Sequence, residues 1–339
     1  MTATLFGAPL DDAIRLMGSI EQAVSITSST LAGGPSSMSR RIHVINGDLD
    51  FEVLPDRALD LGQLRVAGMP VAWISPTGFP RLVAAGVDAQ SWLRAFGGGL
   101  LTTCGLLNVG PASHDGEQSH PMHGRISSLP AEVTRTEVVD EEIVIEGIVR
   151  EAAVFGENLE LHRRITSRVG GRTVRVADRL VNRGSRPVEP MVLYHLNFGW
   201  PLVDEGTELR SPATEVRPRD DDAAVGATSW ATFPAPQDRY PEQVFQHLLP
   251  ADQTIDVEVV SPRGLTVGVR FDSAQLPGLF QWRVAEPGHY VLGVEPSLVP
   301  TILGRTAARE QNLLVPLEPG GHLNLGVEVT LSTPVPSRR

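Results

Sequence analysis

The stretch with the most reactive side chains runs from Val188 to Pro201, with the sequence VEPMVLYHLNFGWP. It begins with the alternation of a half-buried strand and then carries His195, Asn197 and Trp200 in quick succession. Imidazole is the side chain whose ordinary pKa lies nearest neutrality, so His195 is the first candidate for moving a proton. We interpret the stretch as the wall of a pocket; the alternative is a core histidine hydrogen-bonded to a neighbouring carbonyl.

A carboxylate stands at the end of a second alternating run, His289 to Glu295, directly before Pro296. A carboxylate at a strand end beside a pocket can serve as a general base. The structural alternative is that Glu295 caps the following turn.

Two further clusters carry polar chemistry. Asp56, Arg57 and Asp60 lie between apolar runs, and they form either a salt bridge at a turn or an arginine fork aimed at a polar ligand. A later loop reads HPMHGR and contains His120, His123 and Arg125. Its two histidines are compatible with a metal, but no other compact ligand group accompanies them. We therefore favour a polar site for a sugar or an acid.

The elements that must position these side chains are mostly strands. Residues 130–185 contain four runs with period-two alternation, separated by turns rich in Gly and Asn. On these strands we expect Glu151, His162 and Arg163 on the solvated face or rim. The hairpin signal Asn46-Gly47 joins two further strands.

Other segments give weaker expectations. Residues 10–17 have helical spacing, residues 71–74 are strand-like, and residues 230–250 are expected to form a long loop that closes over the pocket. Cys104 lies in the apolar run LLTTCGLLNV. Since reactive thiols need an accessible, electropositive setting, we expect a buried structural thiol.

Composition excludes several classes of function. The 339 residues carry a net charge of −11, which disfavours nucleic acid and anionic membranes as partners. No apolar run approaches the roughly 20 residues needed to span a bilayer. The N-terminus lacks the pattern of a secretory signal, and the single cysteine excludes an intrachain disulfide. We therefore expect a cytoplasmic protein.

These motifs occur in the order found in aldose 1-epimerases (galactose mutarotases). The chain resembles that superfamily, and more narrowly its DUF4432 branch, from about Ile42 to Leu331. The matching stretches are PDRALDLG (55–62), GGLLTTCGLLNVG (98–110), HGR (123–125), DRLVNRGSRPVEPMVLYHLNFGWP (178–201), GVEPS (293–297) and LEPGGHLNLGVEVTL (317–331).

The resemblance implies an all-β fold, the β-supersandwich of galactose mutarotase-like proteins, with a sugar pocket on one sheet. The sandwich domain would span 42–331. A short, partly helical N-terminal arm (1–41) would pack on it, and 332–339 would be a C-terminal tail.

The resemblance also implies roles for individual residues. His195 corresponds to the general acid of mutarotases and Glu295 to the general base. His123 corresponds to a second family histidine, and Arg57 to a sugar-binding arginine. Asn197 departs from the pattern, because an aromatic residue usually stands near this position.

Arg125, Asn197 and Trp200 are expected to contact the substrate. Their positions suggest a sugar, or a reaction, that differs from that of mutarotases. The implied activity is that of an isomerase acting on the anomers of a free sugar or sugar derivative. An acid and a base on opposite sides of the ring suffice for it, without a cofactor.

Two alternatives remain open from the sequence. One is a carbohydrate-binding module without catalysis; fold alone does not decide between them. The other is a metal-assisted sugar isomerase or epimerase that uses His120, His123, His195 and Glu295. A homo-oligomer is compatible with either.

Overall fold

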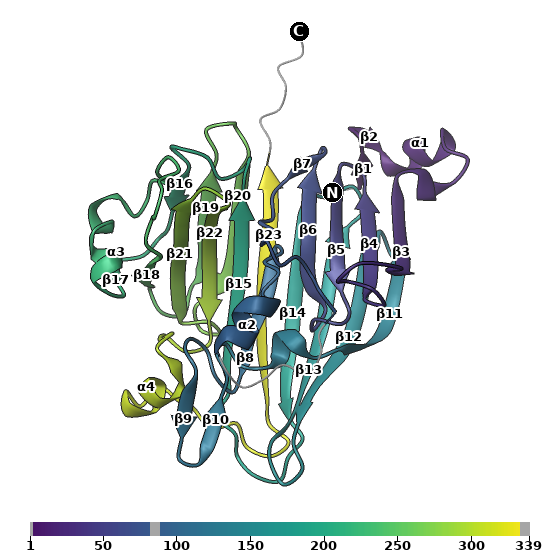
Figure 1. Cartoon of the computed structure of the whole chain (residues 1–339). Coiled ribbons are helices and arrows are strands. Elements are labelled where there is room, and N and C mark those ends of the chain that lie inside the picture. Colours follow the sequence, from purple (N-terminus) through teal and green to yellow (C-terminus); the bar gives the residue numbers. More distant parts are fainter. Residues whose placement is uncertain (1–2, 82–88, 333–339) are drawn as a thin grey trace.

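Two large antiparallel sheets stacked face to face form the molecule, as the computed structural model shows (Figure 1). The structure describes residues 3–81 and 89–332. The 11-stranded sheet has the order β17-β18-β21-β22-β15-β8-β6-β5-β4-β3, with β7 beside β6. In that order its strands span Glu215–Pro218, Gln243–Leu248, Gly278–Glu286, His289–Ser297, Met191–Gly199, Leu101–Leu106, Asp60–Val66, Leu49–Leu54, Arg40–Asn46 and Val24–Thr30, and β7 spans Met69–Pro70.

The second sheet has eight strands in the order β11-β12-β13-β14-β23-β20-β19-β16. These span Ala131–Val139, Glu142–Ala152, Asn158–Arg168, Thr173–Asn182, His322–Ser332, Thr266–Asp272, Thr254–Val260 and Glu208–Arg210. Small elements complete the described chain: β1 (Thr4–Leu5), β2 (Ala8–Pro9), β9 (Ser113–Asp115), β10 (Gln118–His120), α1 (Leu10–Arg15), α2 (Ala89–Ala95), α3 (Asp221–Ala224), α4 (Gly304–Glu310) and the 3-10 turns η1 (Ile20–Gln22), η2 (Ile126–Ser128) and η3 (Ala227–Ser229).

Period-two patterning predicted the main strands, and it is confirmed. The four runs between 130 and 185 form β11 to β14, and Asn46-Gly47 turns the β4–β5 hairpin. One face of each strand enters the core between the sheets, where aliphatic side chains such as Leu161, Ile165 and Val176 are buried. Burial of this apolar surface is the main favourable term for the fold.

Strand β15 places its side chains alternately on two faces. Tyr194 and Leu196 point into the core between the sheets. Leu193 faces away from that core and packs in a second apolar cluster, together with the buried thiol of Cys104. Because side chains alternate along a strand, His195 lies on this outer face as well. In Figure 1, α2 lies across this face of the sheet.

An ionic network beneath β15 joins the two sheets. The Arg163 guanidinium donates to Asp60 at 2.7 Å and to Asp178 at 2.6 and 2.9 Å. The Tyr194 hydroxyl donates to Asp178 at 2.7 Å. Burial without partners would make these charges very costly, so the network fixes β15 relative to the second sheet.

The expectation that Glu151 and Arg163 are solvated is therefore wrong. Arg163 is fully buried, and Glu151 is 4% exposed. Both residues share the phase of aliphatic neighbours on their strands, Leu161 and Val149, and so they enter the core. His162 does lie on the outer face, where it contacts Glu160 at 3.0 Å.

Other segments differ from expectation in detail. Residues 71–74 form only isolated bridges to Phe198 and Gly98, because β7 ends at Pro70. Part of 230–250 is the strand β18 and not a loop, because it pairs with the distant β21. In the first 41 residues, α1 lies within the predicted helix, and β3 forms an edge of the larger sheet. Of the predicted tail, 333–339 lies outside the described residues. Within the described chain, no helix has the length and apolarity needed to cross a bilayer.

Candidate active site

A cavity of about 350 Å³ lies on the outer face of the larger sheet, over β15, β21 and β22. Its floor includes His195, Trp282 and Glu295. Its walls come from α2, from the segment 110–123, and from the turn before α4. The cavity thus combines neighbouring strands with loops distant in sequence, which is the usual construction of a small-molecule site.

His195 and Glu295 meet on the floor of this cavity. The pairs Leu196–Val294 and Leu193–Ser297 set β15 and β22 in register, which puts residue 195 opposite residue 295. His195 Nε2 lies 3.2 Å from Glu295 Oε1, and both side chains are about 5% exposed, at 6% and 4%. The two residues, 100 positions apart in sequence, therefore form one buried acid–base pair. They stand side by side and leave no room for a ring between them.

Burial controls the proton affinity of the pair. The pKa of Glu295 is raised to about 8, mainly by desolvation; the Glu242 carboxylate adds to this rise and Arg219 opposes it. Desolvation also lowers the pKa of His195 to about 3, with a smaller contribution from His123 and an opposing one from Asn197. Near neutral pH the pair consequently holds one proton, located on the carboxyl, and carries no net charge.

Aromatic rings surround the imidazole of His195. The ring centroids of Phe96 and Trp282 lie 5.3 and 5.2 Å from that of His195. Trp92 stacks on Phe96 at 4.5 Å and also contacts His123 at 4.5 Å. The apolar surroundings explain the strong desolvation of the pair and provide flat surfaces for a ligand.

His123 reaches the same cavity from the opposite wall. Its ring centroid lies 6.2 Å from that of His195. The Gly110 amide donates to His123 Nδ1 at 3.4 Å, which leaves Nε2 to carry the proton of the neutral ring. Burial lowers the pKa of His123 to about 4, so this ring acts as an uncharged donor.

A glycine makes room for the catalytic candidates. Gly293 lies on the same face of β22 as Glu295, and a Cβ at this position would approach Glu295 Oε1 to 2.9 Å and Trp282 Cβ to 3.0 Å. A side chain there would displace the carboxyl or the indole.

Sequence reasoning missed an ion pair at the cavity wall. Arg219 Nη2 donates to Glu242 Oε2 at 3.0 Å, and the Trp282 indole donates to Glu242 Oε1 at 2.8 Å. Glu242 comes from the region interpreted as a loop (230–250), and only the pairing of β18 with β21 brings it to Trp282. The alternation of Phe280 and Trp282 in the sequence was the signal that could have indicated this wall, because it places both aromatic side chains on one face of β21.

The remaining predicted substrate contacts do not line this cavity. The Arg57 guanidinium donates to the carbonyls of Ala95 and Pro80, at 2.9 and 2.8 Å, and so supports the end of α2. The Asn197 amide is fully buried and donates to the carbonyls of Gly99 and His195.

Trp200 and Arg125 lie further away. Trp200 is 61% exposed, and the Arg263 guanidinium lies over one face of its ring, with Cζ 5.6 Å from the ring centroid. Arg125 lies near His120 and Glu151, whose pKa values its charge affects.

The two histidines of the HPMH motif face different cavities. His123 lines the cavity of His195, whereas His120 lines a separate one. Among residues 3–81 and 89–332, no three His, Cys, Asp or Glu side chains converge as a metal-binding group.

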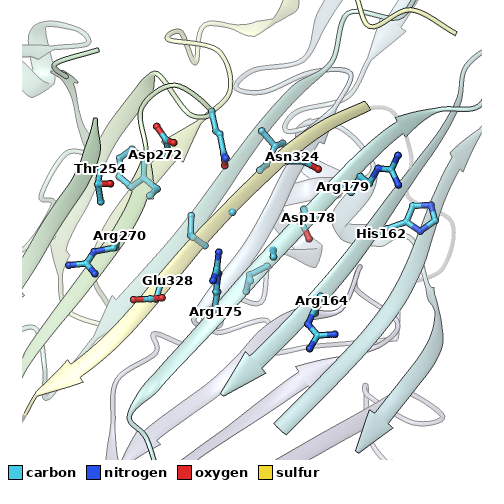
Figure 2. A pocket seen from close by; sticks show the side chains of 17 residues that line it. His162, Arg164, Arg175, Asp178, Arg179, Thr254, Arg270, Asp272, Asn324 and Glu328 are labelled. Carbon is cyan, nitrogen blue, oxygen red and sulfur yellow. The ribbon is translucent and has the colours of Figure 1, made fainter. Parts of the chain in front are cut away.

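A larger hollow, with a volume of about 590 Å³, lies on the outer face of the eight-stranded sheet. Figure 2 shows a rim of charged side chains there, including Arg175, Arg179, Arg270 and Glu328. Its histidine, His162, is bonded to exposed-face Glu160. Among its described lining residues there is no buried acid–base pair, so size alone does not make this hollow the site of chemistry.

Comparison with known proteins places the chain in a family. Residues 36–331 match the model described as "Domain of unknown function (DUF4432)". The chain belongs to the DUF4432 family. No curated protein matches the sequence.

Solved structures share the fold of this DUF4432 protein. A Klebsiella pneumoniae protein provisionally named an aldose 1-epimerase is 25% identical, with a TM-score of 0.82 over 91% of this chain and 83% of that one. A galactose mutarotase-like protein from Clostridium acetobutylicum is 12% identical, with a TM-score of 0.63 over 92% and 99%. Galactose 1-epimerase from Lactobacillus acidophilus is also 12% identical, with a TM-score of 0.60 over 92% and 99%. The predicted galactose mutarotase-like sandwich is confirmed.

Proposed function

We propose that this DUF4432 protein is an isomerase that interconverts the anomers of a free sugar by acid–base ring opening. The observation that carries the proposal is the buried contact of 3.2 Å between His195 Nε2 and Glu295 Oε1 on the floor of a cavity. Perturbed titratable groups in a cavity are typical of catalytic sites. The similarity to proteins named as aldose 1-epimerases supports the same class of substrate.

The side-by-side arrangement suits the anomeric centre. The hydroxyl oxygen O1 and the ring oxygen O5 are bonded to the same carbon, so both can face the pair from one edge of the sugar. Glu295 takes the proton of the O1 hydroxyl, the C1–O5 bond breaks as a C1=O1 carbonyl forms, and His195 protonates O5. Rotation about the C1–C2 bond and reversal of these steps give the other anomer.

The pair supplies the single proton that this cycle needs. In the empty cavity the proton lies on Glu295, and transfer across the 3.2 Å contact generates the carboxylate and imidazolium. The opposite division of labour, with Glu295 protonating O5 and His195 accepting from O1, has the same proton count. In both cases the pair is restored after each turnover, without a cofactor.

Other groups of the cavity would hold the sugar. His123 presents an Nε2–H donor toward the cavity, and the Arg219–Glu242 pair offers a donor and an acceptor for hydroxyls. Trp282 offers an apolar face. Within the proposal, Asn197 positions His195 by donating to the backbone carbonyl of His195. Arg57 positions α2 by donating to the carbonyl of Ala95 at the end of that helix.

Anomer exchange measured by NMR over a panel of free aldoses and ketoses tests the proposal. The wild type should accelerate exchange of at least one sugar, and His195→Asn and Glu295→Gln should each remove most of that acceleration. A sugar that binds in the cavity without faster exchange would instead indicate a carbohydrate-binding module. Activity that chelators abolish would indicate the metal-assisted isomerase.

A further inference from the structure

A second cavity, of about 270 Å³, lies on the other side of the segment that carries the two histidines. Leu107 and His120 line it, whereas Gly110 and His123 line the cavity of His195. The two cavities share no lining residue. The remaining walls of the second cavity come from the β12–β13 turn, the connection 184–189 and α4.

His120 is the feature of this cavity that calls for a ligand. The residue is only 4% exposed, yet neither ring nitrogen has a hydrogen-bond partner. Buried polar groups in folded proteins are almost always paired, and leaving one unpaired is unfavourable. A neutral imidazole offers one donor and one acceptor, so His120 is equipped to bind a group that has both.

The charges around His120 balance within the protein. Arg305 donates to Asp115 at 2.7 Å and to Glu189 at 2.8 Å. Arg309 donates to the same two carboxylates, at 2.6 Å each. Two cations and two anions thus satisfy each other along one wall, and this wall has little affinity for a free ion.

Two further charged residues line the cavity with opposite signs. Arg186 and Glu157 face it, and no hydrogen bond or ion pair among the described residues engages the Arg186 guanidinium or the Glu157 carboxylate. Their charges cancel as well. The available groups are therefore one cationic donor, one anionic acceptor and the imidazole, arranged around a cavity with no net charge.

An apolar wall completes the cavity. Phe155 lines it at the tip of the β12–β13 turn and is 99% exposed. Its backbone is in the left-handed region, with φ of 64°. Left-handed backbone is unfavourable for a bulky residue, so the turn holds an exposed aromatic ring at the edge of the cavity at some cost.

We propose that the cavity beside His120 binds a small, neutral polyhydroxy compound, at a site separate from His195 and Glu295. Hydroxyl groups both donate and accept, and so they match His120, Arg186 and Glu157 together. The volume of about 270 Å³ lies just below the roughly 300–1,000 Å³ of pockets for drug-sized ligands, which fits a compound no larger than a monosaccharide. This inference does not depend on the proposed anomer exchange.

Saturation-transfer NMR with the full chain tests this site, using myo-inositol, sorbitol and methyl α-galactoside as probes. None of the three has a free anomeric hydroxyl, so none can undergo the proposed ring opening. At least one should bind the wild type with a millimolar dissociation constant. Arg186→Ala and His120→Asn should each weaken that binding at least tenfold, while Glu295→Gln should leave it unchanged.

The controls separate the outcomes. Arg186 is exposed, so Arg186→Ala tests the site even where His120→Asn fails to fold. The proposal is overturned when no probe binds up to about 50 mM, well above a millimolar dissociation constant. It is also overturned when Arg186→Ala leaves the binding unchanged, whether or not Glu295→Gln abolishes it, or when inorganic phosphate displaces the polyol and binds more tightly.

Discussion

Replacing Glu295 by glutamine should stabilise the protein while removing its activity. Burial raises the pKa of Glu295 from 4.5 to about 8, so the folded protein keeps this carboxyl protonated at neutral pH. The unfolded chain releases the proton once the pH exceeds about 4.5. Stability therefore falls as the pH rises from 4.5 toward 8 and changes no further above 8 on account of this group. A glutamine amide can still donate to His195 Nε2 and has no proton to lose.

The magnitude follows from the width of that pH window. Each pH unit above the unfolded pKa of Glu295 lowers the free energy of unfolding by about 1.4 kcal/mol. The wild type therefore loses about 3 kcal/mol of stability by pH 7, but only about 0.7 kcal/mol by pH 5. Glu295→Gln should recover these amounts. Removal of one proton-transfer group should at the same time lower the rate of anomer exchange by roughly 10²- to 10⁴-fold.

Urea unfolding at pH 5 and pH 7, beside NMR exchange rates, checks both effects. Glu151→Gln is the matched control, because burial raises the pKa of Glu151 to about 8 as well, but Glu151 lies outside the cavity of His195. It should gain similar stability and keep full activity. The reasoning is refuted when Glu295→Gln is no more stabilising at pH 7 than at pH 5, or when both variants keep wild-type exchange.

Further predictions concern the pair and its supports. His195→Asn should lower the exchange rate by roughly 10²- to 10⁴-fold in the same NMR assay. Gly293→Ala should reduce the rate while the fold persists, since its Cβ would lie 2.9 Å from Glu295 Oε1; wild-type kinetics would contradict the proposed packing. Wild-type exchange should stay level from pH 7 down to pH 5 and fall above about pH 8, where the pair loses its proton; a loss near pH 6.5 would indicate an ordinary histidine. Arg163→Met should lower the free energy of unfolding by about 3–5 kcal/mol, because it leaves two buried carboxylates unpaired.

Local patterning was sufficient to predict most of the fold. The strands with period-two alternation emerge where expected, because burial of one face decides both their conformation and their register. The same alternation also contained the correct position of Arg163. It shares a face with Leu161 and Ile165, and Asp178 shares one with Val176 and Leu180. A charged residue on the apolar face of each of two neighbouring strands indicates a buried ion pair. The sequence prediction had considered only the polarity of Arg163 and therefore placed it at the surface.

The site was predictable only in part. Resemblance to mutarotases singled out His195 and Glu295, but their direct contact depends on the register between β15 and β22. Arg219 and Glu242 depended on pairing between strands far apart in sequence, which no local pattern reveals. The separation of His120 from His123 likewise follows from the path of one loop between two cavities.

A crystal structure of the Glu295→Gln variant with a bound sugar would test the central claim most directly. The sugar should be one whose anomers the wild type exchanges. We expect its O1 and O5 to lie within hydrogen-bond distance of His195 Nε2 and the side chain at 295, with the ring against Trp282. A sugar seated with its anomeric carbon turned away from both side chains, or bound only outside this cavity, would contradict the account.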